Sequence, residues 1–235
     1  MKLSALFTRP FLDLVRGEAR CVGRPRDLAW LALGLAAGWW LYVPVHELLH
    51  ALACLAAGGG VTRLEIDPLY GGGLLARWIP WVHAGGDYAG RLSGFDTGGS
   101  DLVYLATDLG PFVLALFPGV WALRRAARAA RPVLFGAALP FALAPLLSLT
   151  GDAYEIGSIL ITRVPPWAGA AARELLRGDD LFRVAAGVAA AGGGAAAWAG
   201  LALAALAGAL WAFATYALGG WLAARLGQGP LEPAP

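Results

Sequence analysis

Residues 28–57 read LAWLALGLAAGWWLYVPVHELLHALACLAA, an apolar run in which Glu47 is the only charged side chain. At about 1.5 Å per residue, a helix of this length covers about 45 Å, which exceeds the roughly 30 Å hydrocarbon core of a bilayer. The stretch therefore predicts a membrane-spanning helix. We expect a kink at Pro44, because proline removes a backbone hydrogen bond, and a helix end at Gly58-Gly59-Gly60.

The composition places the whole chain in a membrane. Of its 235 residues, 58% are hydrophobic and only 14% are charged, and the mean hydropathy is +0.62. Soluble domains are about one quarter charged. We predict an all-α fold, a polytopic membrane helix bundle with a small β-hairpin or loop insertion after the first span. We expect about four spans, near residues 28–57, 102–123, 132–150 and 196–222, and an Ala/Gly-rich stretch from Val184 that adds a half-helix or a fifth span.

The sequence divides into three parts. Residues 1–27 form a basic segment that predicts an amphipathic helix on the cytoplasmic membrane face. Residues 28–226 form the membrane-embedded domain, and the Pro-rich residues 227–235 are expected to be disordered. Cys21 and Cys54 lack CxxC spacing and are expected to be packing residues. No basic stripe alternates with aromatic side chains, which argues against a nucleic-acid partner.

The distribution of arginines predicts the orientation. Residues 1–27 and 124–131 together hold ten basic and three acidic residues, whereas residues 58–101 hold three basic and five acidic residues. Basic residues concentrate in cytoplasmic loops. We therefore expect a cytoplasmic N-terminus in the bacterial inner (cytoplasmic) membrane, an outer 58–101 loop and, with four spans, a cytoplasmic C-terminus.

His46-Glu47-Leu48-Leu49-His50 is an HExxH motif within the first apolar run. On a helix, His46 and His50 lie one turn apart on the same face, where both can bind one zinc ion, and Glu47 can take a proton from zinc-bound water. Ionisable groups at membrane depth are costly and usually functional. The alternative is a pair of histidines that bind their neighbours and no metal.

A catalytic zinc needs a third protein ligand. If residues 132–150 continue as one helix, Asp152 lies about 30 Å from its cytoplasmic end, and His46 lies about 27 Å along the first helix, so both reach similar depth near the outer face. Asp152 is therefore our first candidate. Glu155 is the alternative ligand, or a hydrogen-bond partner of a ligand histidine, and both acids could instead cap the helix end. His83 is a further candidate ligand, and Asp108 could orient a histidine or contact substrate.

The motif and its surroundings resemble the site-2 protease-like (M50-type) intramembrane zinc metalloproteases. The resemblance covers residues 28–160. It rests on His46-Glu47-Leu48-Leu49-His50-Ala51, on the following Gly60–Ile66 segment, which alternates like a strand, and on Asp108-Leu109-Gly110-Pro111. The family's Asn after that Gly-Pro pair is Leu114 here, and its Leu-Asp-Gly motif is replaced by Thr150-Gly151-Asp152-Ala153. Its sites also usually lie nearer the cytosol.

The resemblance implies zinc-dependent hydrolysis of peptide bonds in membrane proteins or peptides, with His46, His50 and Asp152 as ligands and Glu47 as general base. A substrate helix must unwind before attack, and the strand at residues 61–66 could capture it by edge pairing. A membrane zinc hydrolase acting on a non-peptide substrate and a non-catalytic membrane protein of the same fold remain the alternatives.

Overall fold

The computed structural model describes residues 3–233, which divide into two compact units. The first unit comprises Met1–Ala144 and Tyr216–Pro235, and the second comprises Pro145–Thr215. Most of the described residues are helical, as the sequence predicts, and a small sheet belongs to the first unit.

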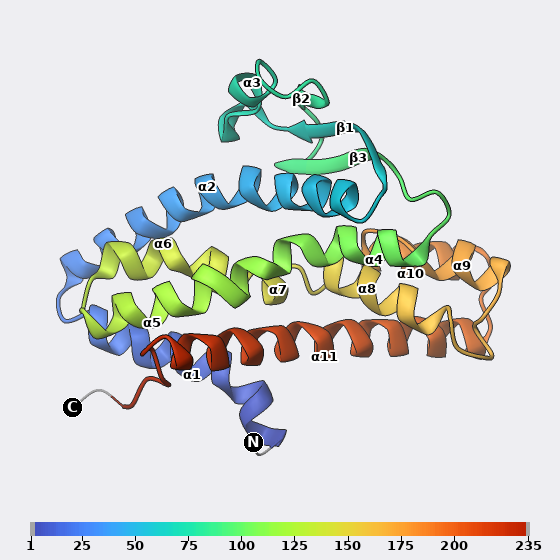
Figure 1. The fold of residues 1–235 in the computed structure, drawn as a ribbon. Helices are drawn as coiled ribbons and strands as arrows, with labels where there is room; N and C mark the ends of the chain where they lie inside the picture. Colours follow the sequence, from blue (N-terminus) through green and yellow to red (C-terminus); the bar gives the residue numbers. More distant parts are fainter. Residues whose placement is uncertain (1–2, 234–235) are drawn as a thin grey trace. The chain divides into compact units, whose positions relative to one another are not determined.

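The first unit is built around α2 (Pro25–Ala56) and α6 (Pro132–Ala142), which lie side by side (Figure 1). Pro25 begins α2, and the Asp27 carboxylate accepts the backbone N–H groups of Gly23 and Arg24, which caps the helix. Glycines allow the two helices to approach closely: a Cβ on Gly34 or Gly38 would collide with the α6 backbone. Small residues four apart are a recurrent device of membrane helix packing.

A second long apolar segment, Asp101–Arg128, contains α4 (Asp101–Leu109), η2 (Gly110–Phe112), η3 (Ala115–Gly119) and α5 (Val120–Arg128). The Ser100 hydroxyl caps α4 by accepting the N–H of Val103. Phe117, before Pro118, has φ −161° and ψ 135°, so the helix is interrupted there. Gly110 lies against the carbonyl of Leu49, and this close approach brings α4 onto the face of α2 that carries His50.

The N-terminal segment is helical, as expected, and forms α1 (Leu3–Cys21), which packs on α5. Arginines of α1 and α5 bind the C-terminal residues: Arg16 donates to the carbonyl of Leu231, and Arg128 donates to the carbonyl of Gly229. Leu231 is itself buried. The C-terminal segment that we expected to be disordered is therefore hydrogen-bonded to two helices through its described residues, which end at Pro233.

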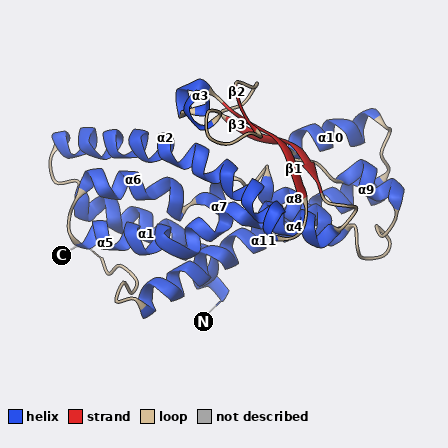
Figure 2. Cartoon of the chain, turned by 45° about the horizontal axis from the view of Figure 1, so that its top comes forward, coloured by secondary structure: helices blue, strands red, loops and turns tan. Residues whose placement is uncertain are grey.

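The insertion after α2 is a three-stranded sheet rather than a hairpin (Figure 2). Its order is β2 (Val82–Ala84), β1 (Gly60–Ile66), β3 (Gly90–Asp96), with η1 (Pro68–Tyr70) and α3 (Gly72–Leu75) between the first two strands in sequence. β1 pairs in parallel with β2 over Leu64–Ile66 and antiparallel with β3. β1 is the central strand and is paired on both sides over Leu64–Ile66, so β2 and β3 are the outer strands, and capture of a substrate by residues 61–66 stays a prediction.

The expected third span, residues 132–150, is not one helix. The eleven residues of α6 cover about 16 Å, and α7 (Ala144–Leu147) follows separately. Pro140 lies inside α6 and Pro145 inside α7. The depth that we inferred for Asp152 assumed a continuous helix and therefore does not hold.

The second unit contains α8 (Asp152–Ile161), α9 (Ala170–Leu176), α10 (Leu181–Ala190) and the first part of α11 (Ala195–Arg225). Gly157 of α8 and Gly208 of α11 each lie against the backbone of the other helix. The Tyr154 hydroxyl donates to the carbonyl of Leu176 at 2.6 Å, which ties α8 to α9. Among the described residues, three segments are long and apolar enough to cross a membrane: Pro25–Ala56, Asp101–Arg128 and Ala195–Arg225. The chain is thus a helical membrane protein with at least these candidate spans.

Candidate metal centre

His46 and His50 lie on the buried face of α2, as the HExxH spacing predicts. Each of the two residues is only 8% exposed. The imidazole rings meet edge to face, with centroids 4.8 Å apart, and their Nε2 atoms lie 3.2 Å from each other. Two nitrogens bound to one tetrahedral zinc at 2.0–2.1 Å are about 3.3 Å apart. The two Nε2 atoms are therefore spaced to share one metal ion.

The other nitrogen of each ring already has a partner. His50 Nδ1 lies 2.8 Å from the carbonyl oxygen of Thr107 in α4, and since a carbonyl can only accept, Nδ1 carries the proton and Nε2 presents its lone pair. His46 Nδ1 lies 2.8 Å from the hydroxyl of Tyr42. Outer partners of this kind orient metal-binding histidines, and a carbonyl partner such as that of Thr107 also fixes the tautomer.

Neither of these partners was predicted from the sequence. Tyr42 precedes His46 by one helical turn on the same face, and its ring packs edge-on to Phe141 at 5.8 Å. Extending the four-residue spacing of the motif backwards would have found it. The partner on Thr107 is a main-chain oxygen, which no side-chain pattern reveals. The residue expected to orient a histidine, Asp108, is its neighbour and is also buried.

Glu47 extends from α2 toward the start of β3. A Cβ built on Gly90 would collide with Cγ of the Glu47 side chain, so only a glycine leaves room for the carboxylate there. The backbone N–H of Asp67 donates to the carbonyl of Ala89, which fixes this end of β3 at the end of β1. The sheet therefore limits the positions that Glu47 can adopt.

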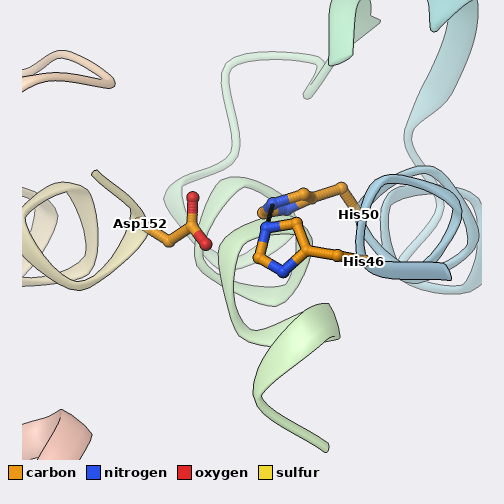
Figure 3. A group of neighbouring side chains, drawn as sticks. All are labelled: His46, His50 and Asp152. Carbon is orange, nitrogen blue, oxygen red and sulfur yellow. Dashed lines mark hydrogen bonds between the residues drawn. The ribbon is translucent and has the colours of Figure 1, made fainter. Parts of the chain in front are cut away.

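Asp152, our first candidate for the third ligand, begins α8 in the second unit. His46, His50 and Asp152 are side chains that together could hold a metal ion, and Figure 3 draws all three. In residues 3–233 they are the one group of three or more His, Cys, Asp or Glu side chains that could hold a metal ion. Glu155, the alternative ligand, is buried in α8 but does not belong to this group, and His83 is exposed on β2.

Two imidazoles and one carboxylate make up a ligand set used by catalytic zinc, because three protein ligands leave the fourth position for water or substrate. Borderline-soft zinc accepts both donor types, whereas calcium and magnesium prefer oxygen alone. The donor set therefore fits zinc.

Comparisons of the chain with models of protein families, with curated proteins and with solved structures found no match.

Proposed function

We propose that this chain is a zinc-dependent intramembrane metalloprotease that hydrolyses peptide bonds of membrane-associated substrates. The observation that carries the proposal is the geometry of α2. Two buried imidazoles direct their Nε2 atoms toward each other at 3.2 Å, and Glu47 lies between them in a helix long and apolar enough to cross a membrane. Paired histidines with both Nδ1 atoms bound to neighbours are held ready for a metal ion.

Each residue has a distinct role in this proposal. His46, His50 and Asp152 would hold a zinc ion, which would supply Lewis acidity to activate water and polarise the scissile carbonyl. Glu47 accepts the proton of the attacking water and then donates it to the leaving amine. The Thr107 carbonyl keeps His50 in the tautomer that presents Nε2, and the Tyr42 hydroxyl orients the His46 ring. Gly90 leaves room for the Glu47 side chain beside β3.

The apolar helix that carries the motif supports a membrane-associated substrate. A helix that crosses a membrane satisfies its own backbone hydrogen bonds, so a substrate helix must unwind before its carbonyl can be attacked. An unwound strand could pair with an outer strand of the sheet, β2 or β3, rather than with β1. β3 is the outer strand that contacts Glu47 through Gly90.

The test is a search for new peptide ends across a whole mixture of membrane proteins. Zinc-loaded wild type and the Glu47→Gln variant are each incubated in proteoliposomes with solubilised bacterial membrane proteins, and new N-termini are labelled and identified by mass spectrometry. We expect wild type to create termini within or beside apolar segments and Glu47→Gln to create none. Glu174→Gln, at an exposed position of α9, is the matched control and should behave as wild type.

Two results would refute the proposal. One is the same set of termini from wild type and from Glu47→Gln, which would assign the cleavage to a contaminant. The other is no new terminus from wild type that has been shown to contain zinc, together with zinc-dependent release of a small product from lipids, which would favour the non-peptide hydrolase.

A further inference from the structure

A groove in the first unit opens between α2, α5 and α6, and it is not part of the metal centre. It encloses about 840 Å³, within the range of about 300–1,000 Å³ that is usual for small-molecule sites. We call it the α5–α6 groove. It has an apolar lining and, at one end, three arginines. The apolar lining includes Leu41, Trp121, Ala122, Leu134, Ala137 and Phe141.

One end of the groove is strongly basic. Arg125, Arg128 and Arg131 line it, all three are exposed, and none of its lining residues is acidic. Arg125 stacks on the ring of Trp121, with 5.4 Å from the guanidinium carbon to the ring centroid. Arg128 donates to the Gln228 side chain and to the carbonyl of Gly229, which are neutral partners, so its charge is not cancelled.

The acidic side chain buried in this part of the first unit is already engaged. Asp13 forms its ion pair with Arg124, the arginine next to Arg125 but on the opposite, buried face of α5. The three exposed guanidinium groups thus form a cationic cluster without a carboxylate among the lining residues. An anionic ligand would complement it.

The location of the three arginines favours one class of anionic ligand. α5 ends the apolar segment Asp101–Arg128, so a groove along α5 lies at membrane depth and its arginines lie where the segment leaves the hydrocarbon. Basic pockets between membrane helices at that level recognise phospholipid headgroups. A free phosphate would use the arginines and leave the apolar lining without a role.

We propose that the α5–α6 groove binds one anionic phospholipid, with its phosphate on Arg125 and Arg131 and an acyl chain along the apolar lining. Guanidinium groups match phosphate through paired N–H donors, and Trp121 holds Arg125 at the edge of the groove. The site is independent of the proposed proteolysis. One lining residue connects the groove to the metal centre: Phe141 packs on Tyr42, which is the hydrogen-bond partner of His46.

The experiment titrates purified full-length protein in mild detergent with phosphatidylglycerol and with phosphatidylcholine of identical chains, and measures bound lipid by native mass spectrometry. We expect a saturable, one-to-one preference for phosphatidylglycerol. Juxtamembrane arginines contribute enough individually that removing two charges in Arg125→Gln/Arg131→Gln should weaken phosphatidylglycerol binding about thirtyfold and barely change phosphatidylcholine binding.

A matched pair of variants separates the site from general surface charge. Arg225 stacks on Trp221 at 5.0 Å, much as Arg125 stacks on Trp121, but it does not line the groove, and Arg26 is exposed elsewhere in the first unit. Arg26→Gln/Arg225→Gln removes the same charge and should bind phosphatidylglycerol as wild type does. Ala122→Phe, which fills the apolar part and keeps every arginine, should also weaken binding.

Three results would overturn the proposal: equal binding of the two lipids by wild type, equal losses in the two double arginine variants, or unchanged binding in Ala122→Phe. Displacement of the lipid by an equimolar amount of inorganic phosphate would likewise reduce the groove to a free-phosphate site. Near-ultraviolet circular dichroism of each variant, unchanged from wild type, ensures that a loss of binding is not a loss of fold.

Discussion

Arg124 and Asp13 form a fully buried ion pair between α5 and α1, 111 residues apart in the sequence, with 2.7 Å between Nη2 and Oδ2. The side chains are 0% and 3% exposed. Arg124 Nε and the Tyr216 hydroxyl donate to the same carboxylate oxygen. Arg124 also donates to the carbonyl of Gly220, so one guanidinium connects α1, α5 and α11.

Removing the charge of Asp13 should therefore destabilise the first unit strongly. Asp13→Asn leaves the Arg124 guanidinium buried without a counter-charge, which costs about 3–5 kcal/mol. Thermal unfolding in detergent measures the loss. Asp179→Asn is the control, because Asp179 and Arg183 form an exposed pair at 4.0 Å, and such pairs contribute at most about 1 kcal/mol. Equal unfolding temperatures for the two variants would show that the buried pair does not hold the helices together.

The Tyr42 hydroxyl should tune the affinity for metal. Tyr42→Phe removes the hydrogen bond to His46 Nδ1 and keeps the packing on Phe141. Loss of such an outer partner weakens metal binding about 10–100-fold. Competition with a coloured zinc chelator gives the dissociation constant. Tyr88→Phe, at an exposed tyrosine, should match wild type, and a Tyr42→Phe affinity equal to that of Tyr88→Phe would remove Tyr42 from the site.

Gly90 should be required for hydrolysis but not for metal binding. In Gly90→Ala the new Cβ would collide with Cγ of Glu47, so the Glu47 side chain must move, whereas neither histidine is among the atoms nearest to that Cβ. Because a misplaced general base loses most of its effect, we expect hydrolysis to fall about 100-fold or more with the zinc content unchanged. Gly73→Ala is the control, since nothing lies within 4 Å of its Cβ position. Full activity of Gly90→Ala would mean that the sheet does not hold Glu47 in place.

Cys21 should contribute a pH dependence to stability. Burial raises the pKa of its thiol from 9.0 to about 11, and a hydrogen bond with the Arg131 backbone opposes this in part. Between those pH values the unfolded thiol has lost its proton and the folded one has kept it, so stability is lost as the pH rises from 9 to 11. Unfolding midpoints across this range should fall more steeply for wild type than for Cys21→Ala. Parallel slopes would contradict the assignment.

The local parts of this structure were predictable from the sequence, and the long-range parts were not. HExxH spacing places His46 and His50 on one face of a helix because the α-helical period is 3.6 residues, and apolar composition places that helix in a membrane. The carbonyl of Thr107 carries no side-chain signal, and the contact of Gly90 with Glu47 depends on how β3 pairs with β1. Neither follows from a local pattern.

The prediction of one continuous helix over residues 132–150 is wrong. Residues 132–150 are apolar enough to lie in lipid, but hydropathy does not report continuity, and the prolines at positions 140 and 145 accompany a division into α6 and α7. From the sequence, the arginines of residues 1–27 and 124–131 predicted only the orientation in the membrane. That some of them bind the C-terminal residues was not predicted. In the structure, Arg16 and Arg20 of α1 donate to main-chain carbonyls of the C-terminal segment.

The metal content of detergent-purified protein tests the central claim most directly. Mass spectrometry should find about one zinc per chain in wild type, as a three-ligand catalytic site requires. His46→Ala and Asp152→Ala should lose it, whereas Glu155→Ala and Glu47→Gln should keep it. A folded wild type that takes up no zinc even after reconstitution, or a His46→Ala variant that retains its zinc, would contradict the account and leave HExxH as a pair of hydrogen-bonded histidines in a membrane helix.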